Sequence, residues 1–234
     1  QAYDTIIPKI LTDKFGMSQA NSGIIMALDN ILALFMLPLF GAISDRCKNR
    51  MGRRTPFILI GTIIAAAAFM LLSFADSLQL KNISAVSAID DPAALEILYD
   101  SVGDETLETP DGTRFVLNEQ FERDVFAAIT SEIEQDGAMV SNPDYTNYVV
   151  PARHAYAHAQ TQENPFPLIL FICILLIALI SMATFRSPAV ALMPDVTIKP
   201  LRSKANAVIN LMGTAGGMIV LGMGIVFGTG AAKN

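Results

Sequence analysis

Two ionisable residues lie inside apolar runs of this chain and are the first candidates for chemistry. Asp29 falls seven residues into the run Gly23–Ile43, and Arg186 lies in an apolar stretch that continues to Pro194. A charge in a membrane-length segment is costly, so it must face a cavity, become protonated or pair with an opposite charge. We expect Asp29, with Asn30 beside it, to accept a proton or a hydroxyl hydrogen, and Arg186 to donate hydrogen bonds. The alternative is that both charged residues belong to structural ion pairs near the membrane surfaces.

A second group of charged residues forms a short basic loop between two apolar runs. Residues 45–54 contain five Lys or Arg and one carboxylate. Residues 195–204 lie between two later apolar runs. They carry one carboxylate, Asp195, and three Lys or Arg residues. Short cation-rich loops stay on the cytoplasmic side of a membrane, and the two spans between these loops agree with a common side. The sequence therefore predicts that both loops are cytoplasmic.

The elements that position these residues are predicted to be membrane-spanning helices. The 234-residue chain is 52% hydrophobic and 16% charged, with a mean hydropathy of +0.45, whereas soluble domains average about 25% charged residues. Buried helices of soluble proteins rarely extend far without a polar face. The basic residues lie at a membrane edge, which argues against nucleic acid as a partner. Four runs are long enough to cross a hydrocarbon core of about 30 Å: Gly23–Ile43, Thr55–Ala75, Pro165–Phe185 and Ala205–Ala232.

An acidic segment separates the second and third of these runs. Residues 76–164 hold 17 of the 22 Asp and Glu residues and four Lys or Arg. With the two basic loops inside, we expect an extracellular insertion over residues 77–164. Turn-forming sequences divide it, and helical spacing of apolar residues predicts helices over Pro92–Ser101 and Leu117–Glu134.

Two histidines in this insertion, His154 and His158, are four residues apart. On a helix they would share a face and could bind a metal ion. Because two ligands without a third are a weak pattern, a solvated face is the better interpretation, and we predict neither a metal site nor a cofactor. The insertion also lacks a catalytic grouping, which argues against an enzyme.

Two motifs resemble those of the major facilitator superfamily of transporters. The first runs from Pro38 to Ile58 and includes Gly41, Ser44-Asp45-Arg46 and Gly52-Arg53-Arg54-x-Pro56. The second runs from Arg186 to Asn206 and includes Pro194-Asp195 and Arg202-Ser-Lys204. Both are similar to the glycoside–pentoside–hexuronide:cation symporters. The long spacing between Asp45 and Gly52 is most similar to the sucrose:proton symporter branch.

This resemblance implies an all-α membrane protein. The chain would be an incomplete N-terminal six-helix half of a major facilitator fold, with about five transmembrane helices and the acidic extracellular insertion between helices 3 and 4. Residues 1–76 would hold a partial helix 1 with helices 2 and 3, residues 77–164 the insertion, and residues 165–234 helices 4 and 5. The implied partners are a sugar substrate, a coupling proton with sodium as the alternative, the lipid bilayer, and a C-terminal half beyond this chain.

The resemblance also implies roles for individual residues. A cytoplasmic gate, closed by ionic contacts at the helix ends, would comprise Gly41, Asp45, Arg46, Gly52, Arg53, Arg54, Asp195 and Arg202. In the family such contacts hold the inner side shut while the outer side is open. The substrate or proton pathway would comprise Asp29, Asn30, Arg186, Asn206 and Asn210.

The sequence departs from the family at the carboxylates that couple transport to a cation. Their positions correspond to Ala33, Leu37 and Leu179 here. Proton coupling would therefore use Asp29 or the other half, and an uncoupled facilitator remains an alternative. A further alternative is a membrane-anchored sensor or binding protein that acts through the insertion.

Close helix packing is predicted in the last run. Gly213 and Gly217, and likewise Gly224 and Gly228, have the four-residue spacing that lets membrane helices approach one another.

Overall fold

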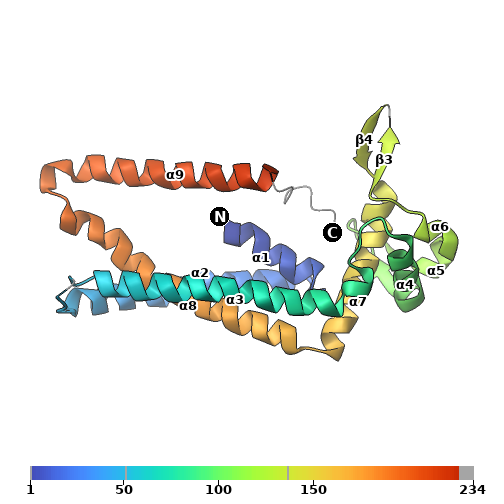
Figure 1. Ribbon diagram of the computed structural model, residues 1–234, viewed down its shortest axis with the longest axis horizontal. Coiled ribbons are helices and arrows are strands. Elements are labelled where there is room, and N and C mark those ends of the chain that lie inside the picture. Colours follow the sequence, from blue (N-terminus) through green and yellow to red (C-terminus); the bar gives the residue numbers. More distant parts are fainter. Residues whose placement is uncertain (1, 51, 136, 227–234) are drawn as a thin grey trace. The chain divides into compact units, whose positions relative to one another are not determined.

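The computed structural model describes residues 2–50, 52–135 and 137–226, and most of these residues are helical (Figure 1). By length and composition, four of the described helices could cross a membrane. The four predicted runs are therefore helices, whereas α1 (Ala2–Asp13) has only 12 residues. The predicted end of the last run at Ala232 lies outside the described residues, as does Gly228. The four long helices are α2 (Gln19–Arg46), α3 (Thr55–Asn82), α8 (Phe166–Val196) and α9 (Arg202–Val226).

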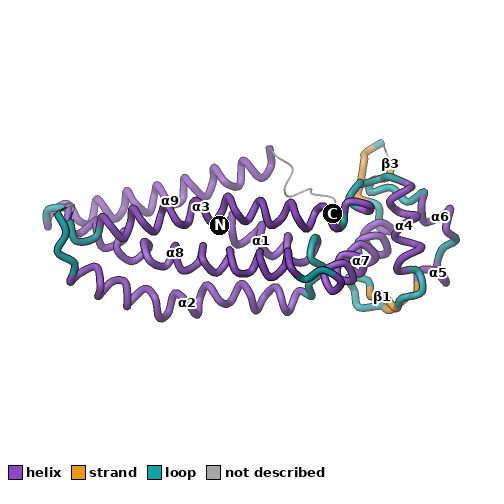
Figure 2. Tube along the Cα trace, turned by 60° about the horizontal axis from the view of Figure 1, so that its bottom comes forward, coloured by secondary structure: helices purple, strands orange, loops and turns teal. Residues whose placement is uncertain are grey.

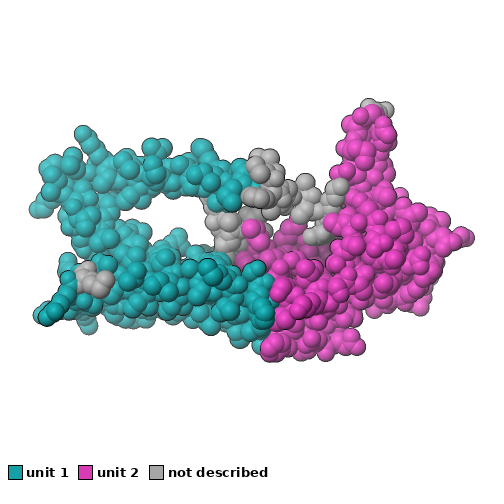
Figure 3. All heavy atoms as spheres, viewed as in Figure 1, with its two compact units in different colours: residues 1–5, 23–75, 169–231 teal, residues 6–22, 76–168, 232–234 magenta. Residues whose placement is uncertain are grey.

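The chain divides into two compact units, which Figure 3 shows in different colours. The first contains residues 23–75 and 169–226, and therefore most of the four long helices. The second contains residues 6–22 and 76–168, so the polar insertion folds together with the connection between α1 and α2.

The long helices of the first unit expose many apolar side chains. Leu34 and Phe35 of α2 are 70% and 68% exposed, and Leu221 of α9 is 70% exposed. An apolar surface of this kind is stable against lipid or further helices, not against water. Pro38 lies inside α2, where membrane helices tolerate proline better than soluble ones. These exposures agree with a multi-pass membrane protein.

Close backbone approaches occur where α8 crosses its two neighbours in the first unit. A Cβ atom added at Gly61 of α3 would lie 2.9 Å from the Phe185 Cβ atom and 3.1 Å from the Ser181 carbonyl oxygen of α8. A Cβ atom at Gly41 of α2 would lie 3.0 Å from the Ser187 Oγ atom of α8. By contrast, nothing lies within 4 Å of such an atom at Gly213. The predicted close packing is therefore absent from the described surroundings of that glycine.

The insertion is a small mixed unit, and Figure 2 shows that the described strands lie in this part of the chain. Its short strands form two antiparallel pairs, with Leu107 opposite Phe115 in one and Ile133 opposite Val140 in the other. The elements are η1 (Ser84–Val86), α4 (Pro92–Val102), β1 (Thr106–Glu108), β2 (Arg114–Val116), α5 (Leu117–Gln120), α6 (Arg123–Ala127), β3 (Glu132–Gln135), β4 (Ala138–Ser141), η2 (Tyr145–Val149) and α7 (Val150–Glu163).

A hydrophobic core stabilises this second unit. Leu98, Phe126 and Val149 come from α4, α6 and η2, and each is 0% exposed. Aromatic rings extend the core, and the ring centroids of Phe121 and Tyr148 are 4.9 Å apart in an edge-to-face arrangement. Burial of such side chains supplies the free energy that orders a polar, acidic segment. The insertion is therefore a folded unit with a hydrophobic core of its own.

One of the two helix predictions for the insertion is correct and one is wrong. The first helix is α4, whose N-terminus is capped by the Asp91 carboxylate accepting from the Ala93 amide at 3.1 Å. The second prediction, Leu117–Glu134, is divided into α5, α6 and β3. The chain becomes extended at Phe121. Val125 is 53% exposed while Phe126 is fully buried, so the apolar residues do not share one helical face.

Candidate functional site

Arg54 lies between two carboxylates at the ends of the long helices. Its Nη2 atom is 2.9 Å from Asp45 Oδ1, and its Nε atom donates to Asp195 Oδ2 at 2.7 Å. Arg53 Nη2 is 3.8 Å from the same Asp195 oxygen. The Arg54 side chain is only 11% exposed, whereas Asp45 is 55% and Asp195 is 34% exposed. We call these four residues the Arg54 cluster.

Three helices bring the Arg54 cluster together. Asp45 lies in the last turn of α2, Arg53 and Arg54 directly precede α3, and Asp195 lies in the last turn of α8. The connection from α2 to α3 turns at Gly52, whose φ of +99° is a conformation that favours glycine. Gly41 thus contributes at a helix crossing and Gly52 at a turn.

The charges of the Arg54 cluster oppose the helix dipoles beside them. Carboxylates at a helix C-terminus and cations at an N-terminus are each unfavourable, by up to about 1 kcal/mol at an exposed site. Asp45 and Asp195 are at the ends of their helices, and Arg53 and Arg54 are at the start of theirs. Each charge is therefore favourable only while its partner is in contact. Such a contact can separate without disrupting a hydrophobic core.

Two further predicted gate residues have other surroundings. Arg202 Nη2 donates to the Pro194 carbonyl at 2.8 Å and its Nε to the Thr197 carbonyl at 3.4 Å, so it caps the C-terminus of α8. Arg46 is exposed at the end of α2, and it forms no ion pair within the described part of the chain.

The predicted pathway residues are not brought together. Asp29 is half-buried in α2, while Asn30 beside it and Arg186 in α8 are exposed. Among residues 2–50, 52–135 and 137–226, neither Asp29 nor Arg186 forms an ion pair. Asn206 and Asn210 are exposed on α9, where the Asn210 carbonyl accepts the Thr214 hydroxyl at 3.0 Å. These positions remain predictions.

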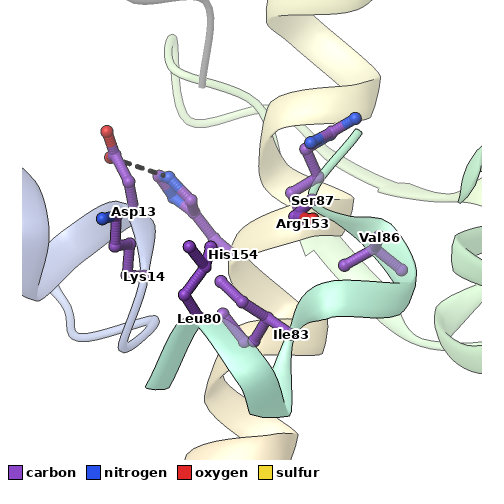
Figure 4. A pocket seen from close by; sticks show the side chains of 9 residues that line it. Asp13, Lys14, Leu80, Ile83, Val86, Ser87, Arg153 and His154 are labelled. Carbon is purple, nitrogen blue, oxygen red and sulfur yellow. Dashed lines mark hydrogen bonds and ion pairs between the residues drawn. The ribbon is translucent and has the colours of Figure 1, made fainter. Parts of the chain in front are cut away.

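The second unit contains a polar cluster that the sequence did not predict. Asp13 Oδ1 lies 3.2 Å from His154 Nε2, and the two side chains border a small pocket of about 60 Å³ (Figure 4). Beside them, Lys14 Nζ is 2.7 Å from Asp76 Oδ2. The i, i+4 spacing of His154 and His158 marks His154 as a candidate ligand, but no local pattern indicates a partner that is 141 positions away.

Comparison with known proteins supports the resemblance in the N-terminal part of the chain. Residues 2–86 match the family model described as "MFS/sugar transport protein". The sucrose transport protein SUC3 of Arabidopsis thaliana is 37% identical over 59 residues, which cover 25% of this chain and 10% of that protein. The sucrose transport protein SUT5 of Oryza sativa is 36% identical over 59 residues, covering 25% and 11%. No solved structure gives a significant match.

A human relative extends the comparison beyond plants. The proton-associated sugar transporter A of Homo sapiens is 39% identical over 59 residues, covering 25% of this chain and 8% of that protein. The match therefore spans about a tenth of the length of these curated relatives. The membrane-length helices define a multi-pass membrane protein. Residues 2–86 are similar to the sugar-transporting major facilitators, which are a family of transporters.

Proposed function

We propose that this chain is the N-terminal part of a secondary sugar transporter that works by alternating access with a C-terminal half. The observation that carries the proposal is the Arg54 cluster, which joins the ends of three membrane-length helices. The family match over residues 2–86 covers two of those helices and supplies the class of substrate. Because sucrose transport proteins are among the relatives, glycosides are the first candidates for the transported sugar.

In this proposal the Arg54 cluster is the cytoplasmic gate. While the cluster is intact, Arg54 holds the ends of α2 and α8 to the start of α3. Opening the inner side requires Arg54 to leave at least one carboxylate and exchange that contact for water. The required free energy is modest, because exposed ion pairs are each worth about 0–1 kcal/mol. The gate can therefore open and close during each transport cycle.

Proton coupling is assigned to Asp29. Asp29 is a half-buried carboxylate within a membrane-length helix, and ionisable residues in such positions commonly belong to proton relays. Asn30 and Arg186 supply hydrogen bonds to sugar hydroxyls, and Asn206 and Asn210 line the pathway from α9. The coupling carboxylates of the symporter family correspond to Ala33, Leu37 and Leu179, which disfavours sodium.

The topology follows from the charge distribution. Loops 45–54 and 195–204 are placed in the cytoplasm because they carry clustered cations, and the acidic insertion 77–164 is placed outside the cell. Lipid and a C-terminal half cover the exposed apolar faces of α2 and α9 in a multi-pass arrangement in the cell membrane.

The test is uptake of radiolabelled sucrose and maltose by cells that express the full-length protein, at about pH 5.5 and about pH 7.5. We expect faster uptake in acid, loss of uptake in Asp29→Asn, and normal uptake in the control Glu119→Gln, which changes an exposed carboxylate of the insertion. Absence of uptake of both sugars, with the protein verified in the membrane, would remove the glycoside assignment. Uptake that is unaffected by Asp29→Asn would remove the coupling role of Asp29.

A second candidate function is a membrane-anchored sensor or binding protein that acts through the insertion. The observation in its favour is that the insertion has its own hydrophobic core, with Leu98 and Phe126 fully buried. Deletion of residues 80–163 separates the candidates. A sensor loses its response entirely, whereas a transporter keeps uptake that depends on Asp29 and Arg54.

A further inference from the structure

The connection between α1 and α2 is attached to the insertion by contacts within the second unit. Gln79 Nε2 donates to the Lys14 carbonyl at 2.8 Å and to the Thr161 hydroxyl at 3.0 Å. Gln79 is 0% exposed, so these hydrogen bonds are shielded from water. Lys14 also pairs with Asp76 at 2.7 Å. One segment of about ten residues is thus bonded to the end of α3 and to α7.

The backbone of the same segment lies directly against α7. Gly16 has a φ of +62°, and a Cβ atom added there would lie 2.3 Å from the His158 amide nitrogen and 2.6 Å from the His154 carbonyl oxygen. Both neighbours are backbone atoms of a helix, which cannot rotate away. Only glycine fits this position, because glycine has no Cβ atom to accommodate and adopts a positive φ without strain.

The contact between Asp13 and His154 is the part of this attachment that can change its charge. The Asp13 side chain is 14% exposed and the His154 side chain is 38% exposed, so protons can reach the imidazole. Imidazole ordinarily changes its charge between pH 5 and 8, where carboxylates stay ionised. When the imidazole is protonated, its hydrogen bond to the ionised carboxylate also becomes an ion pair between two full charges.

The other charged groups around His154 are already engaged. Lys14, which lines the same pocket, is paired with Asp76. Arg153 donates to the Ala88 carbonyl at 2.6 Å, and its guanidinium lies 5.9 Å from the centre of the Tyr145 ring. His158 Nε2 is 2.8 Å from Gln162 Nε2, one turn further along α7. Within the described residues, Asp13 is therefore the charged group in direct contact with the His154 imidazole.

We propose that the Asp13–His154 contact is a pH-responsive clasp, in which protonation of His154 tightens the attachment of the α1–α2 connection to the insertion. The clasp gives the insertion a role in the protein. It makes the mobility of the segment that precedes α2, the helix that carries Asp29, depend on the pH at the insertion. The inference rests on contacts within one unit and not on the identity of the transported solute.

The test is hydrogen–deuterium exchange of the full-length protein in lipid nanodiscs, at about pH 5.5 and about pH 7.5, with rates corrected for the intrinsic effect of pH. We expect the amides of residues 9–17 to exchange about threefold to tenfold more slowly at the lower pH, because the clasp is then an ion pair as well as a hydrogen bond. His154→Gln keeps a donor without a titrating charge and should remove the difference. His158→Gln should retain it.

Several results would overturn the clasp. These are equal corrected exchange at both pH values in the wild type, an unchanged pH difference in His154→Gln, or equal loss of the difference in His158→Gln. A second pair of variants tests the attachment itself. Gly16→Ala should speed exchange of residues 9–17 at both pH values, whereas Gly103→Ala, whose Cβ atom would lie 2.3 Å from Asn118 Oδ1 elsewhere in the insertion, should not. No effect of Gly16→Ala would mean that the segment is not attached. None of these readouts requires transport, so the clasp and the proposed function can fail separately.

Discussion

Arg54 and Asp195 are 141 positions apart in the chain, yet the Arg54 Nε atom donates to Asp195 Oδ2 at 2.7 Å. The same guanidinium contacts Asp45 at 2.9 Å, so one side chain joins three helix ends. Because Asp45 has a partner in this chain, the proposed gate can be tested with single substitutions.

Arg54→Gln should weaken the closed cytoplasmic side and slow sugar uptake. The substitution removes contacts to two carboxylates, and such ion pairs are each worth about 0–1 kcal/mol. The equilibrium of the proposed gate should therefore shift by up to about 30-fold toward the open inner side. The measurement is uptake together with cysteine-accessibility labelling from the cytoplasmic side. Arg46→Gln is the control, because exposed Arg46 has no ion pair among the described residues. Equal effects of the two substitutions would contradict the Arg54 cluster as the gate.

Gly61→Ala should lower the thermal stability and the sugar uptake of the protein more than Gly41→Ala does. At Gly61 the new methyl group would lie 2.9 Å from the Phe185 Cβ atom and 3.1 Å from a backbone oxygen, so α8 must move. At Gly41 the nearest atom is the Ser187 hydroxyl oxygen, which can rotate away. Overpacking of the Gly61 kind costs about 1–3 kcal/mol. Thermal stability of the purified protein and uptake are the measurements. A larger loss in Gly41→Ala would show that the α2–α8 crossing is the tighter one.

Leu98→Ala should destabilise the insertion by about 2–5 kcal/mol, the usual range for a leucine truncated in a core. Leu98 is 0% exposed within the hydrophobic core of the second unit. Hydrogen exchange of the α4 amides in the full-length protein reports the loss as faster local opening. The matched control is Val125→Ala, which truncates a side chain that is 53% exposed and should change exchange little. If both variants behaved like the wild type, the insertion would not be held by this core.

Tyr145→Phe should make the insertion more resistant to alkaline pH. Burial of the phenol raises the pKa of Tyr145 above its ordinary value, and the neighbouring Arg153 offsets this only in part. A group whose pKa is raised on folding stabilises the protein below its unfolded pKa, about 10 for tyrosine, and loses that contribution as the pH rises. The wild type should therefore lose stability above about pH 10 faster than the variant does.

Near neutral pH the Tyr145→Phe substitution should change the stability by less than about 1 kcal/mol. The hydroxyl group of Tyr145 is buried without a hydrogen-bond partner among the described residues. Hydrogen exchange of η2 and α7 in the full-length protein, at about pH 8 and about pH 10.5, gives both comparisons. Parallel loss of protection in the two proteins would show that Tyr145 does not titrate on unfolding.

Local features of the sequence were sufficient to predict the long helices and the basic loops. Hydrophobicity over about 20 residues depends on composition alone, and α2, α3, α8 and α9 follow the predicted runs. The start of α4 could also be predicted from neighbouring residues, since Asp91 provides the N-cap and Pro92 the first helical position. The motif around Asp45 also indicated a resemblance to the major facilitators, and residues 2–86 match a family model of sugar transporters.

Tertiary structure decided which residues meet. The spacing of apolar residues predicted one helix over Leu117–Glu134, but packing of Phe126 into the core while Val125 stays exposed divides that segment. Asp13 meets His154, and Arg54 meets Asp195, across 141 positions in each case. Asp29 and Arg186 form no ion pair with each other among residues 2–50, 52–135 and 137–226. Contacts of this range depend on how helices cross and where a chain turns, and neither is encoded in the types of the residues that finally touch.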